Sequence, residues 1–272
     1  MDEHCTKLKA SLEEAFCMPF TVDTSVVDGE RHYVCAPSNE GETLFCVEIY
    51  VHNNIRLIAD IRPQKHGGYL LQAMAGADEA KRTLFAQLKE RLCGMDARVT
   101  CCVNGQSLDE EHWPTVWKSF ACQMVLLPIP DTAAAGCLGL IAEWAQHAME
   151  LVFALLPITD ALPDTLDGAP GEGEAREVMS TRYERNPLNR KLCLALKGYN
   201  CAVCGMNFFT AYGDIGYHFI EVHHTTPVSA MGEGYRLDII CDLVPVCPNC
   251  HAMLHRKTPP LTVDQLKALL RG

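Results

Sequence analysis

The spacing of apolar residues in the first half of the chain predicts three helices. Residues 3–17 repeat apolar positions every fourth residue, which is typical of a helix with one buried face. Residues 78–93 have the same spacing, and Asp78 is a suitable N-cap. Residues 133–156 are mostly apolar but are interrupted by polar side chains, which indicates an amphipathic core helix. The positions that carry the first two patterns are Leu8, Leu12, Phe16, Leu84, Phe85, Leu88 and Leu92.

A second pattern, with a period of two, predicts strands between these helices. Residues 43–52 alternate in polarity, and residues 55–61 form a returning strand after an Asn-Asn pair that suits a tight hairpin turn. Further strands are predicted over residues 98–103 and 120–127. Helices mixed with hairpin-connected strands predict an α+β domain with an antiparallel sheet. No motif in this part indicates chemistry, so we interpret it as a sensing or partner-binding domain of unknown ligand.

The periodic pattern stops at residues 159–175, TDALPDTLDGAPGEGEA, where Pro, Gly and acidic residues dominate. Such a composition is typical of a flexible linker. It divides the chain of 272 residues into a domain at 1–158 and a second domain at 176–272.

Composition sets the class of protein. No apolar run reaches the roughly 18 residues that span a bilayer, and the N-terminus lacks the regions of a signal peptide. We therefore expect a cytoplasmic protein without a membrane partner. There are 15 cysteines. In a chain that is not exported they are thiols or metal ligands rather than a disulfide framework, and we interpret those of the N-terminal domain as buried structural thiols.

Charge is distributed unevenly between the two halves. Residues 1–175 contain 12 Lys and Arg against 26 Asp and Glu, a net charge of −14. Residues 176–272 contain 11 against 8, a net charge of +3, so the overall −11 does not exclude contact between the C-terminal half and DNA. Basic residues lie on either side of the motifs described next, where they could contact phosphates or form a solvated helix face: Arg182, Arg185, Arg190, Lys191 and Arg256.

Four cysteines of the second domain form two Cys-x-x-Cys pairs, Cys201 with Cys204 and Cys247 with Cys250. Each pair can direct two thiolates at one ion, and two pairs complete a tetrahedral zinc site. The alternative is four unrelated buried thiols. The paired spacing favours a structural Zn²⁺ that stabilises a domain with a modest core.

The residues between and after these pairs predict a strand, a second antiparallel strand and a helix. Residues 219–224 and 243–247 are the strands, and Pro248 begins the helix at its first turn, where proline is well tolerated. On that helix His251 and His255 are four residues apart and share a face. Strand, strand and helix held together by a zinc ion would bring His223 or His224 against this face of the helix.

His223 and His224 are adjacent on the first strand, so their side chains point to opposite sides and should have different roles. One can join His251 and His255 as a third metal ligand, and the other can deprotonate a water molecule. Glu221 lies two residues before His223, where it is either a support for the site or part of the scaffold.

The stretch CAVCG, FIEVHHTTPVS and DLVPVCPNCHAMLH resembles the HNH (ββα-metal) endonucleases, and most closely their McrA-like branch. The resemblance covers residues 183–270 and includes RYERNPLNRKLC and YGDIG. It does not reach the N-terminal domain. By this resemblance the C-terminal domain is a zinc-stabilised ββα-metal nuclease fold.

The resemblance also assigns roles to single residues. His224 takes the position of the general base, His223 that of the neighbouring metal ligand, and His251 and His255 those of the metal ligands on the helix. Asp242 stands where the family has its middle Asn, so this sequence departs from the family name. An Asp there can brace the loop that orients the base but offers no amide donor.

The sequence thus predicts a metal-dependent DNA endonuclease that restricts modified or foreign (phage) DNA. Its catalytic ion is Mg²⁺, Mn²⁺, Ni²⁺ or Zn²⁺, in addition to the structural Zn²⁺. The N-terminal domain could bind a homodimer partner or a defence-system protein. Two alternatives are open: a non-catalytic zinc module that binds DNA or protein, and a nuclease toxin or effector.

Overall fold

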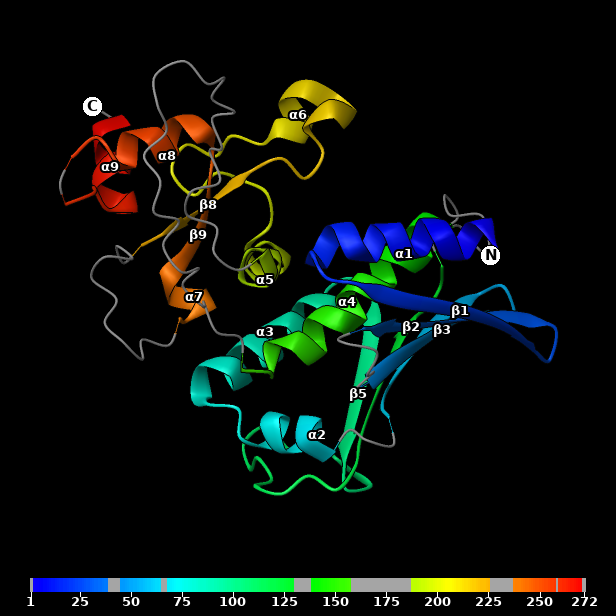
Figure 1. Ribbon diagram of the computed structural model, residues 1–272. Coiled ribbons are helices and arrows are strands. Elements are labelled where there is room, and N and C mark those ends of the chain that lie inside the picture. Colours follow the sequence, from blue (N-terminus) through cyan, green and yellow to red (C-terminus); the bar gives the residue numbers. More distant parts are fainter. Residues whose placement is uncertain are drawn as a thin grey trace, which may run out of the picture. The chain divides into compact units, whose positions relative to one another are not determined.

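The computed structural model describes residues 2–38, 45–64, 68–129, 138–157, 187–225, 237–257 and 259–270 (Figure 1). The chain forms two compact units, Met1–Pro157 and Ile158–Gly272. The predicted linker at 159–175 lies outside the described residues. None of the helices in the described ranges is long and apolar enough to cross a membrane.

The N-terminal unit is an antiparallel sheet with helices on one face. Along the sheet the strand order is β1-β2-β3-β4-β7-β5-β6, and each neighbouring pair is antiparallel. Helices α1, α3 and α4 pack together and against the sheet (Figure 1). The prediction of an α+β domain with an antiparallel sheet is therefore confirmed. The elements are α1 (Glu3–Phe16), β1 (Phe20–Val27), β2 (Glu30–Pro37), β3 (Phe45–His52), β4 (Arg56–Pro63), α2 (Gly68–Ala75), α3 (Glu79–Cys93), β5 (Ala97–Val103), β6 (Gln106–Ser107), β7 (Phe120–Leu126) and α4 (Leu138–Ala154).

The predicted helix faces are the buried ones. In α1, Leu8 and Leu12 are fully buried, and the Asp2 side chain caps the helix by accepting from the backbone N–H of His4. In α3 the four predicted apolar positions are buried, and Asp78 accepts from the backbone N–H of Lys81. The closing helix α4 begins at residue 138, and the earlier part of its predicted range lies outside the described residues.

The predicted hairpin is β3–β4, whose register pairs Phe45 with Pro63 and His52 with Arg56. Asn53 and Asn54 both have positive φ, 51° and 57°. Asparagine adopts this left-handed conformation more readily than most residues, so the turn follows directly from the sequence. Strands β1 and β2 and helix α2 were not predicted.

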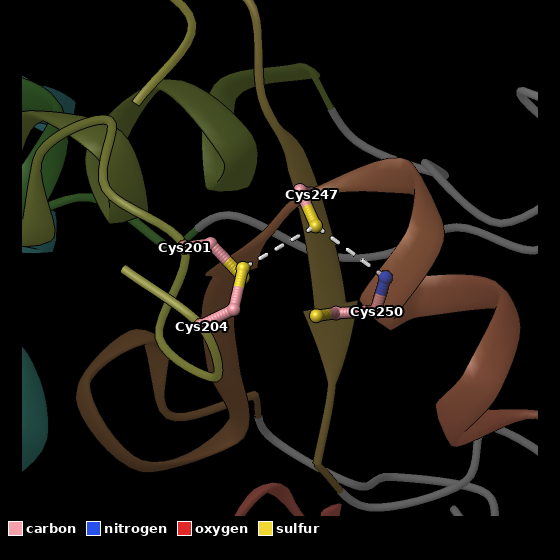
Figure 2. Close-up of side chains that lie close together, drawn as sticks. All are labelled: Cys201, Cys204, Cys247 and Cys250. Atoms are coloured by element: carbon pink, nitrogen blue, oxygen red, sulfur yellow. Dashed lines mark hydrogen bonds between the residues drawn. The ribbon is translucent and has the colours of Figure 1, made fainter. Parts of the chain in front are cut away.

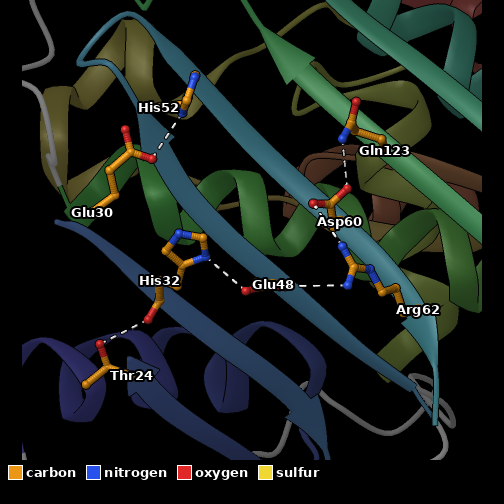
Figure 3. Close-up of polar contacts among 8 residues, drawn as sticks. All are labelled: Thr24, Glu30, His32, Glu48, His52, Asp60, Arg62 and Gln123. Atoms are coloured by element: carbon orange, nitrogen blue, oxygen red, sulfur yellow. Dashed lines mark hydrogen bonds and ion pairs between the residues drawn. The ribbon is translucent and has the colours of Figure 1, made fainter. Parts of the chain in front are cut away.

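Polar side chains cross the sheet on the face that alternates with the buried apolar positions (Figure 3). His32 contacts Glu48 at 2.9 Å, and Arg62 lies 3.9 Å from Glu48 and 3.5 Å from Asp60. Gln123 donates to Asp60 at 2.9 Å. These side chains thus find their hydrogen-bond and ion-pair partners on the neighbouring strands.

Only some of the N-terminal cysteines are buried, although all of them were expected to be. Cys101 and Cys122 are buried and face each other across β5 and β7, with their Sγ atoms 2.7 Å apart. Cys17 and Cys93 are exposed, which corrects the prediction that all of these thiols are buried. The prediction rested on the usual burial of free cysteines. Both residues lie at the C-terminal end of a helix, just past its last buried position, Phe16 in α1 and Leu92 in α3.

The C-terminal unit is built on a two-stranded antiparallel sheet that pairs Glu221 with Val246 and His224 with Leu243. Helix α8 packs on β8 and α9, and helix α5 packs on β9 and α7. The two predicted strands and the helix are therefore present in the predicted order, together with helical turns at 208–216 and 239–242 that were not predicted. The elements are α5 (Pro187–Lys197), α6 (Phe208–Tyr212), η1 (Gly213–Gly216), β8 (Glu221–His224), α7 (Ile239–Asp242), β9 (Leu243–Val246), α8 (Pro248–Leu254) and α9 (Val263–Leu270).

Candidate functional site

The structure brings Cys201, Cys204, Cys247 and Cys250 together, with their Sγ atoms all within 4.8 Å of one another (Figure 2). We call these four residues the thiol cluster. The first pair lies in the loop after α5, Cys247 follows β9 as the N-cap of α8, and Cys250 lies in α8. The N–H of Ala202 donates to the carbonyl of Pro245 at 2.8 Å, which attaches the first pair to β9.

The geometry of the thiol cluster fits a tetrahedral metal ion. A Zn–S bond of about 2.3 Å places the sulfur atoms of a tetrahedron about 3.8 Å apart. The Sγ atoms of Cys204 and Cys247 are 3.8 Å apart. The Cys247 side chain also accepts from the N–H of Cys250 and caps α8. The cluster can therefore hold a structural metal ion, as predicted from the spacing.

Electrostatics also favour a cation in the thiol cluster. Burial raises the pKa of Cys201, but hydrogen bonds from the backbone of Cys204, Cys247 and Val203 outweigh it and lower the pKa to about 7. Burial and the neighbouring thiols raise the pKa of Cys250. Four thiolates this close repel one another unless a cation neutralises them.

A second group, the imidazole cluster, consists of His223, His251 and His255. One ring nitrogen from each lies within 4.8 Å of the others, and the ring centroids are 5.0 to 5.2 Å apart. His223 comes from β8 and His251 from α8, while His255 is the C-cap residue just after α8. The spacing of four thus places both histidines beside the strand, although His255, predicted to lie on the helix, is its C-cap.

His223 has the environment of a metal ligand. It is 3% exposed, and its Nδ1 is buried without a hydrogen-bond partner among the described residues. Burial, together with the charges of the other two imidazoles, lowers its pKa to about 3, so the ring is neutral near pH 7. A buried imidazole nitrogen without a partner costs free energy, which a bound cation would remove. The imidazole cluster therefore fits a divalent ion.

His224 lies beside the imidazole cluster on the same strand. Because successive strand residues point to opposite sides, its side chain leaves β8 on the side away from His223. The next residue, Thr225, donates its N–H to the backbone carbonyl of Asp242 at 2.8 Å, and its hydroxyl donates to the carbonyl of Cys241. The backbone after His224 is thus fixed to the segment that leads into β9.

Asp242 is buried and ends α7. Its Oδ2 accepts from the N–H of Asp238 at 2.9 Å, which closes the single turn of α7. Through its carbonyl it holds Thr225, directly after His224. The contact next to His224 is thus made by the backbone of Asp242, while its side chain accepts a hydrogen bond within α7.

Two basic residues of α5 hold the site in ways that the sequence did not reveal. Lys197 donates to the carbonyls of Ile240 at 2.6 Å and Leu243 at 2.5 Å, so one ammonium group joins α7 to β9. Arg190 donates to the carbonyl of Ile220 at 2.7 Å, just before β8. Only the position of Lys197 in the last turn of α5, where a cation favours the helix dipole, could have suggested such a role.

The residues predicted to contact phosphates are placed unevenly. Arg190 has the carbonyl contact described above, and Lys191 follows it on α5, half-buried. Arg256 is exposed just after His255. Arg182 and Arg185 lie outside the described residues.

Comparison with known proteins agrees with this geometry. Residues 201–257 match the family model of the HNH endonucleases, and this range contains the thiol cluster, the imidazole cluster, His224 and Asp242. The C-terminal unit therefore carries an HNH domain, as the motifs predicted.

A curated relative points to the same branch of the family. The chain is 29% identical over 119 residues to the Type IV methyl-directed restriction enzyme EcoKMcrA of Escherichia coli (strain K12). The alignment covers 43% of this chain and 41% of the relative, so the chain matches about two fifths of that enzyme's length. The McrA-like resemblance is thereby confirmed for the C-terminal domain. No solved structure matches the chain.

Proposed function

We propose that the protein is a metal-dependent DNA endonuclease of the HNH type. The observation that carries the proposal is the convergence of His223, His251 and His255 from two adjacent elements, with His224 on the other side of the same strand. A structural zinc module alone explains the thiol cluster but gives no reason for three imidazoles around a buried, unpartnered nitrogen. Such an enzyme would act in the cytoplasm, where it meets its DNA.

In this proposal, different residues of the chain act as the base, hold the metal ion and position the base. His224 accepts the proton of the attacking water, because an imidazole titrates near neutral pH. His223, His251 and His255 would hold a divalent ion (Mg²⁺, Mn²⁺, Ni²⁺ or Zn²⁺), which would supply Lewis acidity to the scissile phosphate. Asp242 and Lys197 hold the loop and strand next to His224 in place.

We further propose a role in restriction, with modified or foreign (phage) DNA as substrate. The support is the similarity to an enzyme described as methyl-directed, which concerns only the matched 119 residues. In this proposal residues 1–158 form a sensing or partner-binding domain, 159–175 a linker and 176–272 the nuclease domain. Arg182, Arg185, Lys191 and Arg256 would contact DNA phosphates, and Arg190 would do so in addition to its carbonyl contact.

Nicking of supercoiled plasmid tests the proposal. The full chain is incubated with unmodified or cytosine-methylated plasmid and each of the four ions. We expect nicked product with the wild type and a loss of about 10²- to 10⁴-fold in rate for His224→Ala, the range typical of a lost general base. The matched control is His112→Ala, an exposed histidine of the N-terminal unit, which should nick at the wild-type rate.

Zinc content measured on the same preparations shows whether each variant retains its folded C-terminal unit. Full nicking by a zinc-replete His224→Ala protein would show that His224 is not the base. No nicking of either plasmid by the wild type with any ion would leave the non-catalytic module as the better description.

A further inference from the structure

Glu221 contacts the imidazole cluster from outside it. Its Oε2 lies 2.6 Å from Nδ1 of His251, a distance typical of a strong, charge-assisted hydrogen bond. Both side chains are largely shielded from solvent, with exposed fractions of 30% and 20%. Glu221 and His223 are two residues apart on β8, so they share the strand face that meets α8.

The carboxylate is placed to hold an imidazole rather than to bind the ion itself. The group of mutually close ligand atoms among the described residues consists of His223, His251 and His255, and Glu221 is not part of it. With Nδ1 of His251 turned to the carboxylate, Nε2 is the nitrogen left for a cation.

The backbone of Glu221 is fixed on both sides, so its carboxylate is held in a defined place. Glu221 pairs with Val246 at the end of the two-stranded sheet. The preceding residue, Ile220, is buried, and its carbonyl accepts from Arg190. The carboxylate therefore originates from a rigid strand, as a group that must orient another side chain does.

We propose that Glu221 is a positioning residue that fixes His251 with its proton on Nδ1 and its Nε2 directed at the ion bound by the imidazole cluster. The inference rests on the proposed function, because it requires that cluster to bind a metal. A carboxylate behind a metal-bound histidine sets the tautomer and ring orientation and makes the ligand nitrogen more basic. Loss of such a partner typically weakens metal binding by about 10- to 100-fold.

Metal affinity, measured apart from activity, tests this role. Full-length protein that contains one zinc ion per chain is titrated with Mn²⁺, and free Mn²⁺ is followed by electron paramagnetic resonance. We expect Glu221→Ala to raise the Kd for Mn²⁺ by about 10- to 100-fold. Glu221→Gln keeps an acceptor oxygen and should lose less than the alanine variant. Asp264→Asn removes one exposed negative charge from the same unit and should bind as the wild type does.

The outcomes separate this inference from the proposed function. If the wild type binds Mn²⁺, His251→Ala abolishes binding and Glu221→Ala leaves the Kd within twofold, the positioning role is wrong while the metal site stands. If the wild type binds no Mn²⁺, or if His251→Ala binds Mn²⁺ as tightly as the wild type, both the metal site and the positioning role of Glu221 are wrong.

A measurement on the wild type keeps the test valid if the variants lose their zinc. Long-range ¹H–¹⁵N correlation spectra of the metal-bound protein should show His251 protonated at Nδ1. A proton on Nε2 instead would overturn the inference.

Discussion

Removal of the metal from the thiol cluster should unfold the C-terminal unit and leave the N-terminal unit folded. A structural zinc contributes about 10–16 kcal/mol of apparent binding free energy at pH 7. A whole domain is stable by only about 5–15 kcal/mol. The ion therefore contributes about as much as the total stability of the unit, whose core is small. Its buried aliphatic side chains among the described residues are Leu192, Leu194, Ala195, Ile220, Val222, Ile239, Leu243, Val246, Leu254 and Leu266.

The two units can be followed separately in one sample. The three tryptophans, Trp113, Trp117 and Trp144, all lie in the N-terminal unit, so tryptophan fluorescence reports that unit alone. Hydrogen–deuterium exchange of the β8, β9 and α8 peptides reports the other. A strong chelator, or the variant Cys250→Ser, should remove protection from these peptides without changing the fluorescence.

Cys241→Ser is the matched control, because this cysteine is exposed in the same unit and lies outside the thiol cluster. It should keep both zinc and protection. The reasoning would be refuted if β8 and β9 remained protected in protein shown to be free of metal, since the sheet and helices would then be stable without the ion.

Two further predictions concern stability. Burial lowers the pKa of His147, but the carboxylates of Glu143, 3.8 Å from Nε2, and Glu150, hydrogen-bonded to Nδ1 at 2.9 Å, outweigh it and raise the pKa to about 9, above its ordinary value of 6.5. The stabilisation is therefore complete below 6.5 and is lost as the pH rises through about 9. The free energy of unfolding of the N-terminal unit, followed by tryptophan fluorescence, should fall across this range by about 1–3 kcal/mol more than in His147→Gln; equal pH dependence in the two proteins would contradict the pairing. Gly216→Ala should destabilise the C-terminal unit, because a Cβ there would collide with the carbonyl of Phe208; unchanged exchange protection in that unit would contradict it.

Local patterns made the helices, the hairpin and the ligand sets predictable. Leu8 and Leu12 mark the buried face of α1 because helical spacing alone decides which side chains align. The spacing of three residues likewise places Cys247 and Cys250 at the first turn of α8, close to each other. Strand β1 gave no such signal because it is an edge strand in which only Phe20 is buried, so its sequence does not alternate between apolar and polar.

The contacts that support the site could not be predicted from the sequence for a different reason. Lys197 meets the Leu243 carbonyl 46 residues away, and Glu221 meets His251 30 residues away. Such pairs depend on how α5, β8 and α8 pack, and neither a charged residue at a helix end nor a glutamate on a strand specifies its partner. The motif predicted which cysteines and histidines come together in the two clusters, while the packing shows which residues contact them.

The central claim is that the C-terminal unit binds one ion through four thiolates and a second, in an open site, through three imidazoles. Anomalous diffraction from crystals of the full chain, grown with zinc and soaked with Mn²⁺, tests it most directly. The account predicts a zinc peak about 2.3 Å from each Sγ of the thiol cluster, and a separate manganese peak bonded to His223, His251 and His255. Zinc at the thiols with no peak of either metal at these three histidines would contradict it.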